Sequence, residues 1–323
     1  MRGYKKVFII CALFVMAIAA VIAASTKKEE HFVFYTHWTA QAQFAGFIMA
    51  EKNGYFEKEG INVSVQYHDS VHFGAEMLES GKAQFALLDL MAAIQARQKG
   101  LKIVNIMQTS QNSSHCIVTK DEISSINDLN GKEIAVWHGY EPMLMKIVDL
   151  KAGGKINWFE MFSGIEVFKE GAVDNVMCTS YNELGQLENI GYILDSFHTI
   201  PFSEIGIRIP EEGVYVTESF YNSHKEVVKK FVLAATKGWK FAFEHENRTM
   251  QVVLDEMKAA DIPHNIYHQK RMLAEIKKLQ SVDGVLPENY TLDKKIFDET
   301  IDIYNLINKG NETKITFKEF TRY

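Results

Sequence analysis

Cysteine is scarce in this 323-residue sequence, which contains only Cys11, Cys116 and Cys178. Cys11 lies within an apolar leader, so the rest of the chain keeps two cysteines. Two cysteines do not build the disulfide framework that stabilises small secreted proteins. In an oxidising compartment Cys116 and Cys178 can bridge, but the sequence favours two independent buried thiols.

Blocks of positive charge are also missing. The chain has 35 Lys and Arg against 41 Asp and Glu, a formal net charge of −6. The first 24 residues hold three of the basic side chains and no acidic ones, so the remainder carries a net charge of −9. An acidic body without basic clusters argues against nucleic acid as a partner.

Signatures of catalysis are absent as well. The sequence has no Gly-x-Ser-x-Gly elbow, no phosphate-binding loop and no dinucleotide fingerprint. His68, His72 and Glu76 have the four-residue spacing of metal ligands on a helix, but His68 falls at the end of a predicted strand. We therefore predict no catalytic residue, no metal and no cofactor.

The first 24 residues form a separate segment. Arg2, Lys5 and Lys6 precede the unbroken apolar run VFIICALFVMAIAAVIAA (7–24). This order is typical of an export signal, with small residues before Ser25 where a signal peptidase can cut. Eighteen apolar residues are also near the lower limit for a membrane span, so an uncleaved anchor is the alternative. Either way we expect an exported chain, in the periplasm or on the outer face of the cytoplasmic membrane.

Strand and helix patterns alternate after residue 30. The strand HFVFY (31–35) precedes a helix over 43–53, and the alternating strand INVSVQY (61–67) follows. A helix over 71–80 and the strand AQFALLD (83–89) complete the series. This β-α-β-α-β order implies parallel strands joined by crossover helices.

Glycines and alanines mark the helix ends and one small helix face in the first crossover. Gly54 and Gly60 suit the left-handed position that ends a helix or turn. Ala45, Gly46 and Ala50 predict that the helix over 43–53 lies close to the sheet.

A second α/β series begins near residue 115, and the chain is helical by period from about 217. A chain with 47% hydrophobic residues can bury the cores of two medium domains. We predict an α/β fold with two lobes, each an open, mostly parallel sheet with flanking helices, plus a helical C-terminal tail. Lobe one takes residues 31–118 and 214–323, and lobe two takes 119–213. The tail helices are expected around 224–245, 247–260, 265–280 and 294–308.

Ligands in open α/β sheets bind outside the carboxyl ends of the strands. The segments expected there are rich in aromatic rings, which stack on flat ligands, and in polar groups that hydrogen bond a ligand edge. The candidates are Trp38, Gln43, Phe44, Asp89, Gln111, Trp137, Tyr140, Tyr181, Asn182 and Glu183. Each has a structural alternative, because Trp38 or Trp137 can pack on a rim and Glu183 can complement a helix dipole. The recurrence of such residues in both lobes favours a ligand site.

The ordered motifs resemble a known family. HWTAQAQFAGFIMAEKNGYFEKEGINVSV (37–65) is similar to the opening of substrate-binding proteins for thiamine pyrimidine precursors and their sulfonate and nitrate relatives. The likeness continues through SGKAQFALLD, INDLNGKEIAVWHG, KEGAVDNVM and YNE, and covers most of residues 31–245. It implies a type II periplasmic-binding fold, whose lobes close around a small molecule and deliver it to an ABC transporter permease. The crossings between the lobes would fall near 117–121 and 211–216.

The resemblance also implies roles for single residues. In pyrimidine-binding members a first-loop tryptophan and other aromatic residues sandwich the ring, and an Asn-Glu pair contacts its edge. Trp38 matches that tryptophan, and Asn182 with Glu183 matches the pair. Phe44 stands where many members have a histidine, and Ala40 where they have a proline.

Some fungal enzymes of this fold make the thiamine pyrimidine from their own histidine and pyridoxal phosphate. Leu88 and Ala92 stand at their lysine and histidine positions, and their cysteine-rich run is missing. Without an amine for the Schiff base or a donor imidazole, that chemistry is disfavoured.

The expected function is therefore capture of a small heteroaromatic ligand, a thiamine pyrimidine precursor above all, by an exported solute-binding protein. An anionic ligand such as a sulfonate or nitrate is the first alternative, although the candidates include no Arg or Lys and Asp89 and Glu183 would repel an anion. A membrane-tethered ligand sensor is the second, and an uncleaved first segment would favour it.

Overall fold

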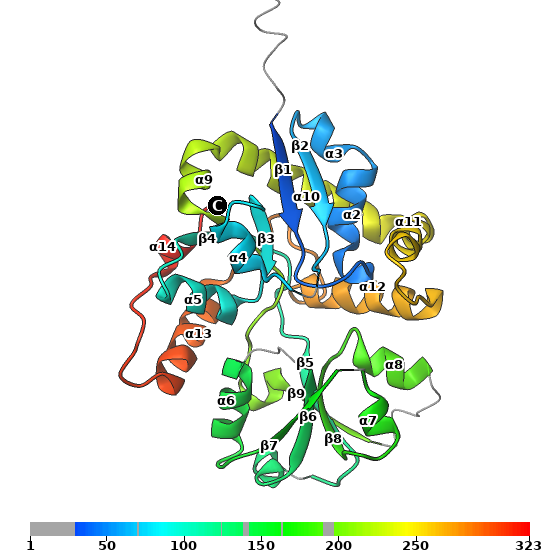
Figure 1. Cartoon of the computed structure of the whole chain (residues 1–323), viewed down its shortest axis with the longest axis vertical. Coiled ribbons are helices and arrows are strands. Elements are labelled where there is room, and N and C mark those ends of the chain that lie inside the picture. The colour runs from blue at the N-terminus through cyan, green and yellow to red at the C-terminus, as the bar shows by residue number, and fades with distance from the viewer. Residues whose placement is uncertain (1–29, 70, 124, 138–141, 163, 190–196) are drawn as a thin grey trace, which may run out of the picture. The chain divides into compact units, whose positions relative to one another are not determined.

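The computed structural model describes residues 30–69, 71–123, 125–137, 142–162, 164–189 and 197–323. These form two five-stranded sheets with flanking helices (Figure 1). Phe32–Tyr323 belong to one compact unit. The predicted α/β architecture with two sheets and C-terminal helices is confirmed.

The first sheet has the order β2-β1-β3-β10-β4. β1 pairs with β3 in parallel, and β10 runs antiparallel to both β3 and β4. Because β10 is reversed, its first residues lie at the same edge as the carboxyl ends of β3 and β4. The strands are β1 (His31–Tyr35), β2 (Asn62–Gln66), β3 (Phe85–Leu88), β4 (Ile103–Gln108) and β10 (Gly213–Thr217).

The second sheet repeats this plan in the order β7-β6-β8-β5-β9. β6 is parallel to β7 and β8, while β5 is antiparallel to β8 and β9. The beginning of β5 therefore lies beside the carboxyl end of β8. The strands are β5 (His115–Thr119), β6 (Glu133–Trp137), β7 (Asn157–Met161), β8 (Asn175–Thr179) and β9 (His198–Pro201).

The helices follow the predicted periods closely. Those described before β10 are η1 (Ala42–Phe44), α2 (Ala45–Lys52), α3 (Tyr55–Lys58), α4 (Gly74–Glu79), α5 (Leu90–Gln98), η2 (Ile126–Leu129), α6 (Pro142–Lys151), α7 (Glu166–Lys169), α8 (Glu183–Asn189) and η4 (Phe202–Ile205). The C-terminal ones are α9 (Glu218–Ser223), α10 (Lys225–Glu244), α11 (Glu246–Ala259), α12 (Ile266–Gln280), α13 (Lys294–Ile307) and α14 (Phe317–Phe320). Within the described ranges, no helix is both long and apolar enough to cross a membrane.

Two segments carry the chain between the sheets. Residues 109–114 lead from β4 to β5, and residues 202–212 lead from β9 to β10. The predicted lobe boundary at 118/119 thus falls inside β5, which pairs within the second sheet from His115 onward. The predicted boundary at 213/214 falls one residue inside β10.

The two glycines of the first crossover have the predicted conformation. Gly54 has φ +65° and Gly60 has φ +72°, on either side of α3. Side chains other than glycine rarely adopt this region, so these positions separate α2, α3 and β2 as the sequence indicated.

The small face of α2 meets helix α10. A Cβ on Gly46 would lie 2.0 Å from the Trp239 ring, and one on Gly238 would lie 2.0 Å from the Gly46 carbonyl oxygen. The small residues of α2 therefore allow a close helix–helix contact, where the sequence predicted close contact with the sheet. This contact fixes the start of α2, which follows directly on η1 and its candidate residue Gln43.

Candidate functional site

Two tryptophans from different sheets lie together. Trp38 follows β1, and its ring meets the ring of Trp137, the last residue of β6, edge to face with centroids 6.0 Å apart. On another side Trp38 stacks nearly parallel to His68, with centroids 6.4 Å apart. Trp38 is 40% exposed, so part of this ring remains open to solvent. The structure thus brings Trp38 and Trp137 together.

Glu183 anchors a network at the end of β8. One carboxylate oxygen accepts hydrogen bonds from the Thr179 backbone N–H at 2.8 Å and from the Thr179 hydroxyl at 2.7 Å. The other oxygen accepts from Trp137 Nε1 at 3.0 Å and from Asn182 Nδ2 at 2.9 Å. Glu183 is 3% exposed, so these four bonds offset the cost of burying its carboxylate.

The Asn182 amide links this network to helix α12. Its oxygen lies 3.0 Å from His268 Nε2 and accepts a hydrogen bond from Gln186 Nε2 at 3.2 Å. On the same helix, Arg271 donates to the Ser180 carbonyl at 2.8 Å. α12 therefore holds the segment that carries Tyr181, Asn182 and Glu183.

A hydrogen bond joins Gln43 of η1, which follows β1, to Tyr181, which follows β8. Gln43 Nε2 donates to the Tyr181 hydroxyl at 2.9 Å and also to Glu212 Oε1. Its Oε1 accepts a hydrogen bond from Gln41. Gln43 is 2% exposed and Tyr181 8% exposed, and burial raises the pKa of the Tyr181 hydroxyl well above its ordinary value. Tyr181 is therefore a neutral hydrogen-bonding group at this position.

Two His–Glu pairs complete the network, one with a half-buried histidine and one fully buried, and the sequence predicted neither. His37 Nε2 lies 3.0 Å from Glu212 Oε1. Burial lowers the pKa of His37, but the charge and hydrogen bond of Glu212 outweigh it, so the pKa is raised. His37 is therefore held toward its protonated form.

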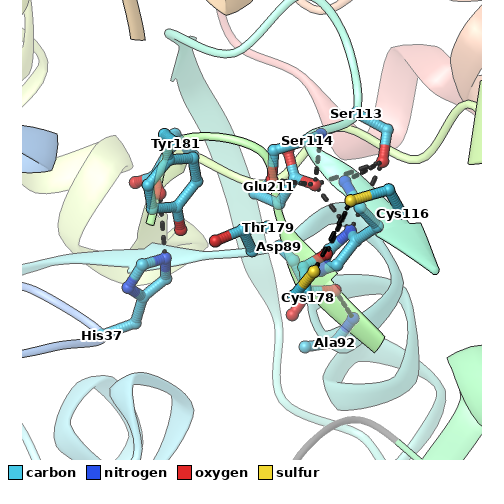
Figure 2. Close-up of polar contacts among 12 residues, drawn as sticks. His37, Asp89, Ala92, Ser113, Ser114, Cys116, Cys178, Thr179, Tyr181 and Glu211 are labelled. Carbon is cyan, nitrogen blue, oxygen red and sulfur yellow. Dashed lines mark hydrogen bonds and ion pairs between the residues drawn. The ribbon is translucent and has the colours of Figure 1, made fainter. Parts of the chain in front are cut away.

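The second pair is His115 with Glu211, at 2.6 Å. The same Glu211 oxygen accepts from the Ser114 backbone N–H at 2.9 Å and from the Ser113 and Ser114 hydroxyls (Figure 2). Burial raises the pKa of Glu211, but the nearby His115 charge and these hydrogen bonds outweigh it and lower the pKa. The other oxygens of Glu211 and Glu212 are buried and have no hydrogen-bond partner among the residues the structure describes.

The reversed strands explain why these residues escaped prediction. The sequence pattern points to residues at the carboxyl ends of strands, whereas Glu211 and Glu212 precede β10, and Ser113 and Ser114 precede β5. Each reversed strand brings its amino end to the edge where the parallel strands finish. The sequence signal was the acidic pair in PEEG (210–213), placed where the chain was expected to cross between lobes.

The remaining predicted residues hold structural positions. Asp89 caps α5 by accepting from the Ala92 backbone N–H at 2.8 Å, and burial raises its pKa despite that bond (Figure 2). Phe44 is fully buried in the core and meets the His37 ring edge-on. Gln111 donates its amide to the Gln108 carbonyl at 2.6 Å. Tyr140 lies outside the described residues.

The histidines with metal-ligand spacing have other neighbours in the structure. His72 pairs with Asp69 at 2.6 Å, and His68 stacks on Trp38. No group of three or more His, Cys, Asp or Glu side chains suited to a metal occurs in the part of the chain that the structure describes.

The chain is similar in sequence to known proteins. The family model described as NMT1/THI5 like matches residues 41–249. The formylaminopyrimidine-binding protein of Halalkalibacterium halodurans is 24% identical over 277 residues, which cover 81% of this chain and 82% of the relative. The riboflavin-binding protein RibY of Chloroflexus aurantiacus is 27% identical over 207 residues, 61% of this chain and 58% of the relative.

Solved structures share the fold. The periplasmic aliphatic sulphonate binding protein SsuA from Escherichia coli superposes with a TM-score of 0.66 at 12% identity, covering 92% of this chain and 93% of that protein. At this level of identity the likeness concerns the fold.

Proposed function

This chain belongs to the NMT1/THI5-like family, and we propose that it is an exported solute-binding protein of an ABC importer that captures a small heteroaromatic ligand. The ligand we propose is a thiamine pyrimidine precursor. The formylaminopyrimidine-binding relative, which aligns over 81% of this chain, supports that choice. Binding proceeds without a catalytic step, and an ABC transporter permease receives the ligand.

The observation that carries this proposal is the meeting of Trp38 and Trp137 beside Glu183. Flat aromatic ligands bind between or upon such rings, and a carboxylate and an amide at the ring edge accept and donate hydrogen bonds. We assign stacking to Trp38, Trp137, Tyr181 and Tyr140. Edge contacts fall to Asn182 and Glu183, and Gln43 orients polar atoms. Asp89 and Gln111 support the site through their bonds to Ala92 and Gln108, and Phe44 supports the first loop from the core.

Charge favours a neutral or cationic heterocycle over an anion. Glu183, Glu211 and Glu212 contribute three carboxylates to the network, and Asp89 adds a nearby acidic group that acts on His37, against the histidines of the two His–Glu pairs. An anionic sulfonate or nitrate would meet net repulsion there. An aminopyrimidine instead offers N–H donors, which suit carboxylate oxygens.

Movement between the sheets completes the proposed cycle. The connections at 109–114 and 202–212 are the two places where a hinge can act, and Gln43 and Tyr181 come from opposite sides of it. We propose that ligand binding stabilises the arrangement in which these sides meet, and that the permease recognises it. A membrane-tethered sensor would use the same motion, and retention of the first segment in the mature protein would favour that alternative.

Thermal unfolding in the presence of different ligands tests the proposal. A formylaminopyrimidine should raise the melting temperature by an amount that grows with the logarithm of its concentration above the dissociation constant, because a ligand that binds only the folded state stabilises it. Riboflavin, an alkanesulfonate and nitrate should have little effect. Stabilisation by the anions alone would overturn the stacking assignment and the charge argument together.

A matched pair of variants locates the site. Trp38→Ala should abolish the ligand-induced shift, whereas Phe159→Ala should keep it. Phe159 is as exposed as Trp38, at 40%, but lies on the edge strand β7 opposite Ala135, which is not a residue of the network. An equal shift in wild type and Trp38→Ala would refute the placement of the ligand.

A further inference from the structure

The two buried cysteines face each other across neighbouring strands. Cys116 on β5 is directly opposite Cys178 on β8 in an antiparallel ladder. The Ser180 N–H donates to the Ser114 carbonyl at 2.9 Å, and the Lys120 N–H donates to the Asp174 carbonyl at 2.9 Å.

Hydrogen-bonded pairs recur every second residue along such a ladder, which makes Cys116–Cys178 one of them. Opposed residues of this kind have Cα atoms about 5.5 Å apart, within the range that a disulfide spans.

The sulfur atoms are already in contact. The two Sγ atoms lie 3.7 Å apart, and the Cys116 thiol also points toward the Cys178 carbonyl at 3.6 Å (Figure 2). Each residue is 2% exposed, and both belong to the same hydrophobic cluster of the second sheet. A bond requires the sulfurs to approach to about 2.05 Å and the Cβ atoms to about 3.5–4.5 Å, so both side chains must rotate and the two strands must move closer at this pair.

We propose that Cys116 and Cys178 are an intramolecular disulfide site, which closes when the chain meets a disulfide oxidant. The sequence suggested two independent thiols, but the register makes them partners. This inference does not depend on which ligand the protein binds.

The oxidant is a small-molecule disulfide or the disulfide form of a dithiol oxidoreductase. One cysteine thiolate attacks an oxidant sulfur, forms a mixed disulfide and releases one thiolate. The second cysteine then attacks the protein sulfur of that mixed disulfide and releases the other thiolate. In sum, two protein thiols and one oxidant disulfide become one protein disulfide and two oxidant thiols.

Reaction in the folded protein should be slow. The hydrogen bond with Cys116, together with burial, holds the pKa of the Cys178 thiol well above its ordinary value, so little thiolate is present. The native strands must open locally before an oxidant reaches either sulfur. Oxidation during folding, before β5 and β8 pair, avoids this barrier.

The bridge would tie together the two strands that enter the candidate site. His115, which pairs with Glu211, precedes Cys116, and Thr179, which donates two hydrogen bonds to Glu183, follows Cys178. The disulfide would therefore stabilise the amino end of β5 against the carboxyl end of β8, at the site edge of the second sheet.

Thiol counting in a glutathione redox buffer tests the proposal. The full chain with Cys11→Ser removes the third thiol and leaves the pair. After refolding in oxidised and reduced glutathione, denaturation and maleimide mass labelling should find no free thiol, and the intact mass should fall by two hydrogen atoms. Two labelled thiols, or glutathione adducts in place of the loss of two hydrogens, would overturn the proposal.

The melting temperature gives a second readout. The oxidised Cys11→Ser chain should melt higher than its reduced form, by on the order of 5–10 °C, because the bridge closes a long loop in the unfolded chain. Cys116→Ala and Cys178→Ala in the same background should lose this dependence on redox state. An oxidised form that melts lower than the reduced form would show that the bridge is not native.

Discussion

At the scale of single residues, Glu183 shows how a predicted ligand group can also be a structural one. The sequence singled it out together with Asn182, and its position at the start of α8 suggested a dipole role as the alternative. Its four hydrogen bonds come from Thr179, Trp137 and Asn182, and they fix the tryptophan that faces Trp38. A ligand at this edge would meet a carboxylate whose geometry is already set.

Replacing Glu183 by glutamine should destabilise the fold. The amide keeps one acceptor oxygen but turns the other into a donor, which then faces the Trp137 and Asn182 N–H groups or the Thr179 donors. An unsatisfied buried donor costs about 1–3 kcal/mol of unfolding free energy, measurable by urea denaturation. Glu170→Gln is the control, because its side chain is 70% exposed and should change stability little. Equal effects of the two variants would contradict the network.

The two His–Glu pairs predict that stability falls both at high pH, the upper arm of the pH–stability curve, and at low pH, its acid arm. His37 has a raised pKa in the folded chain, so its contribution is fully present below its ordinary pKa of 6.5 and is lost as the pH rises through the raised value. Glu211 has a lowered pKa, so its contribution is present above 4.5 and is lost as the pH falls through the lowered value.

Urea denaturation across this pH range measures both arms. His37→Gln should flatten the loss of stability above pH 6.5 and leave the acid arm in place. His264→Gln, at an exposed loop position, is the control and should leave both arms unchanged. Persistence of the full upper arm in His37→Gln would assign it to another group.

At the scale of secondary structure elements, sequence periodicity predicted most of what the structure contains. The helices over 247–260, 265–280 and 294–308 match α11, α12 and α13 to within one residue at either end. These predictions succeed because helix period and caps are local in sequence. Asn265 and Asp293, for example, cap α12 and α13 with their own side chains.

The predictions that missed concern partners distant in the chain. Small residues in α2 indicated a close contact, but only the fold reveals that the contact is Gly238 of α10. Likewise His37 lies 175 residues from Glu212, and His115 lies 96 residues from Glu211. No local pattern pairs them, since the pairing arises from the reversal of β10 and β5.

The α2–α10 contact predicts an unusual sign for a glycine substitution. In an unconstrained helix, alanine stabilises relative to glycine by about 0.5–1 kcal/mol. At Gly238 the new Cβ would lie 2.0 Å from the Gly46 carbonyl oxygen and 2.8 Å from the Ala50 Cβ, so the helices must separate. Gly238→Ala should therefore destabilise by about 1–3 kcal/mol in urea denaturation.

Lys240→Ala on the same helix controls for general effects on α10. Its side chain is 74% exposed, and its replacement should leave the unfolding free energy within about 0.5 kcal/mol of wild type. A Gly238→Ala chain more stable than wild type would show that α2 and α10 accommodate the added methyl group without a clash.

At the scale of the whole molecule, each of the two sheets contains one reversed strand, β10 in the first and β5 in the second. The amino end of each reversed strand therefore lies at the edge of its sheet where the candidate site is. The chain crosses between the sheets next to these strands, so the residues that join the sheets also line the network. Glu211 and Glu212 are both crossing residues and network residues for this reason. Any motion at the crossings would therefore move the His–Glu pairs relative to one another.

The Gln43–Tyr181 hydrogen bond is the direct test of that coupling. Tyr181→Phe removes the hydroxyl that accepts from Gln43 and keeps the ring, so stacking is preserved while one link between the two sides is lost. We expect ligand affinity, measured by titration calorimetry with a formylaminopyrimidine, to fall about 5- to 10-fold, because a net hydrogen bond contributes about 1 kcal/mol.

Tyr67→Phe is the matched control, because it removes a tyrosine hydroxyl after β2 that donates to Glu256 on α11 at 3.1 Å, without linking the two sheets. Both variants should lower the unfolding free energy by a similar amount, since each loses one partly or fully buried hydrogen bond. Only Tyr181→Phe should weaken ligand binding, since only the Gln43–Tyr181 bond connects the parts of the chain that belong to the two sheets. A similar loss of affinity in both variants would show that lower stability, and not the lost link, weakens binding. Unchanged affinity in Tyr181→Phe would show that ligand capture does not depend on the Gln43–Tyr181 contact.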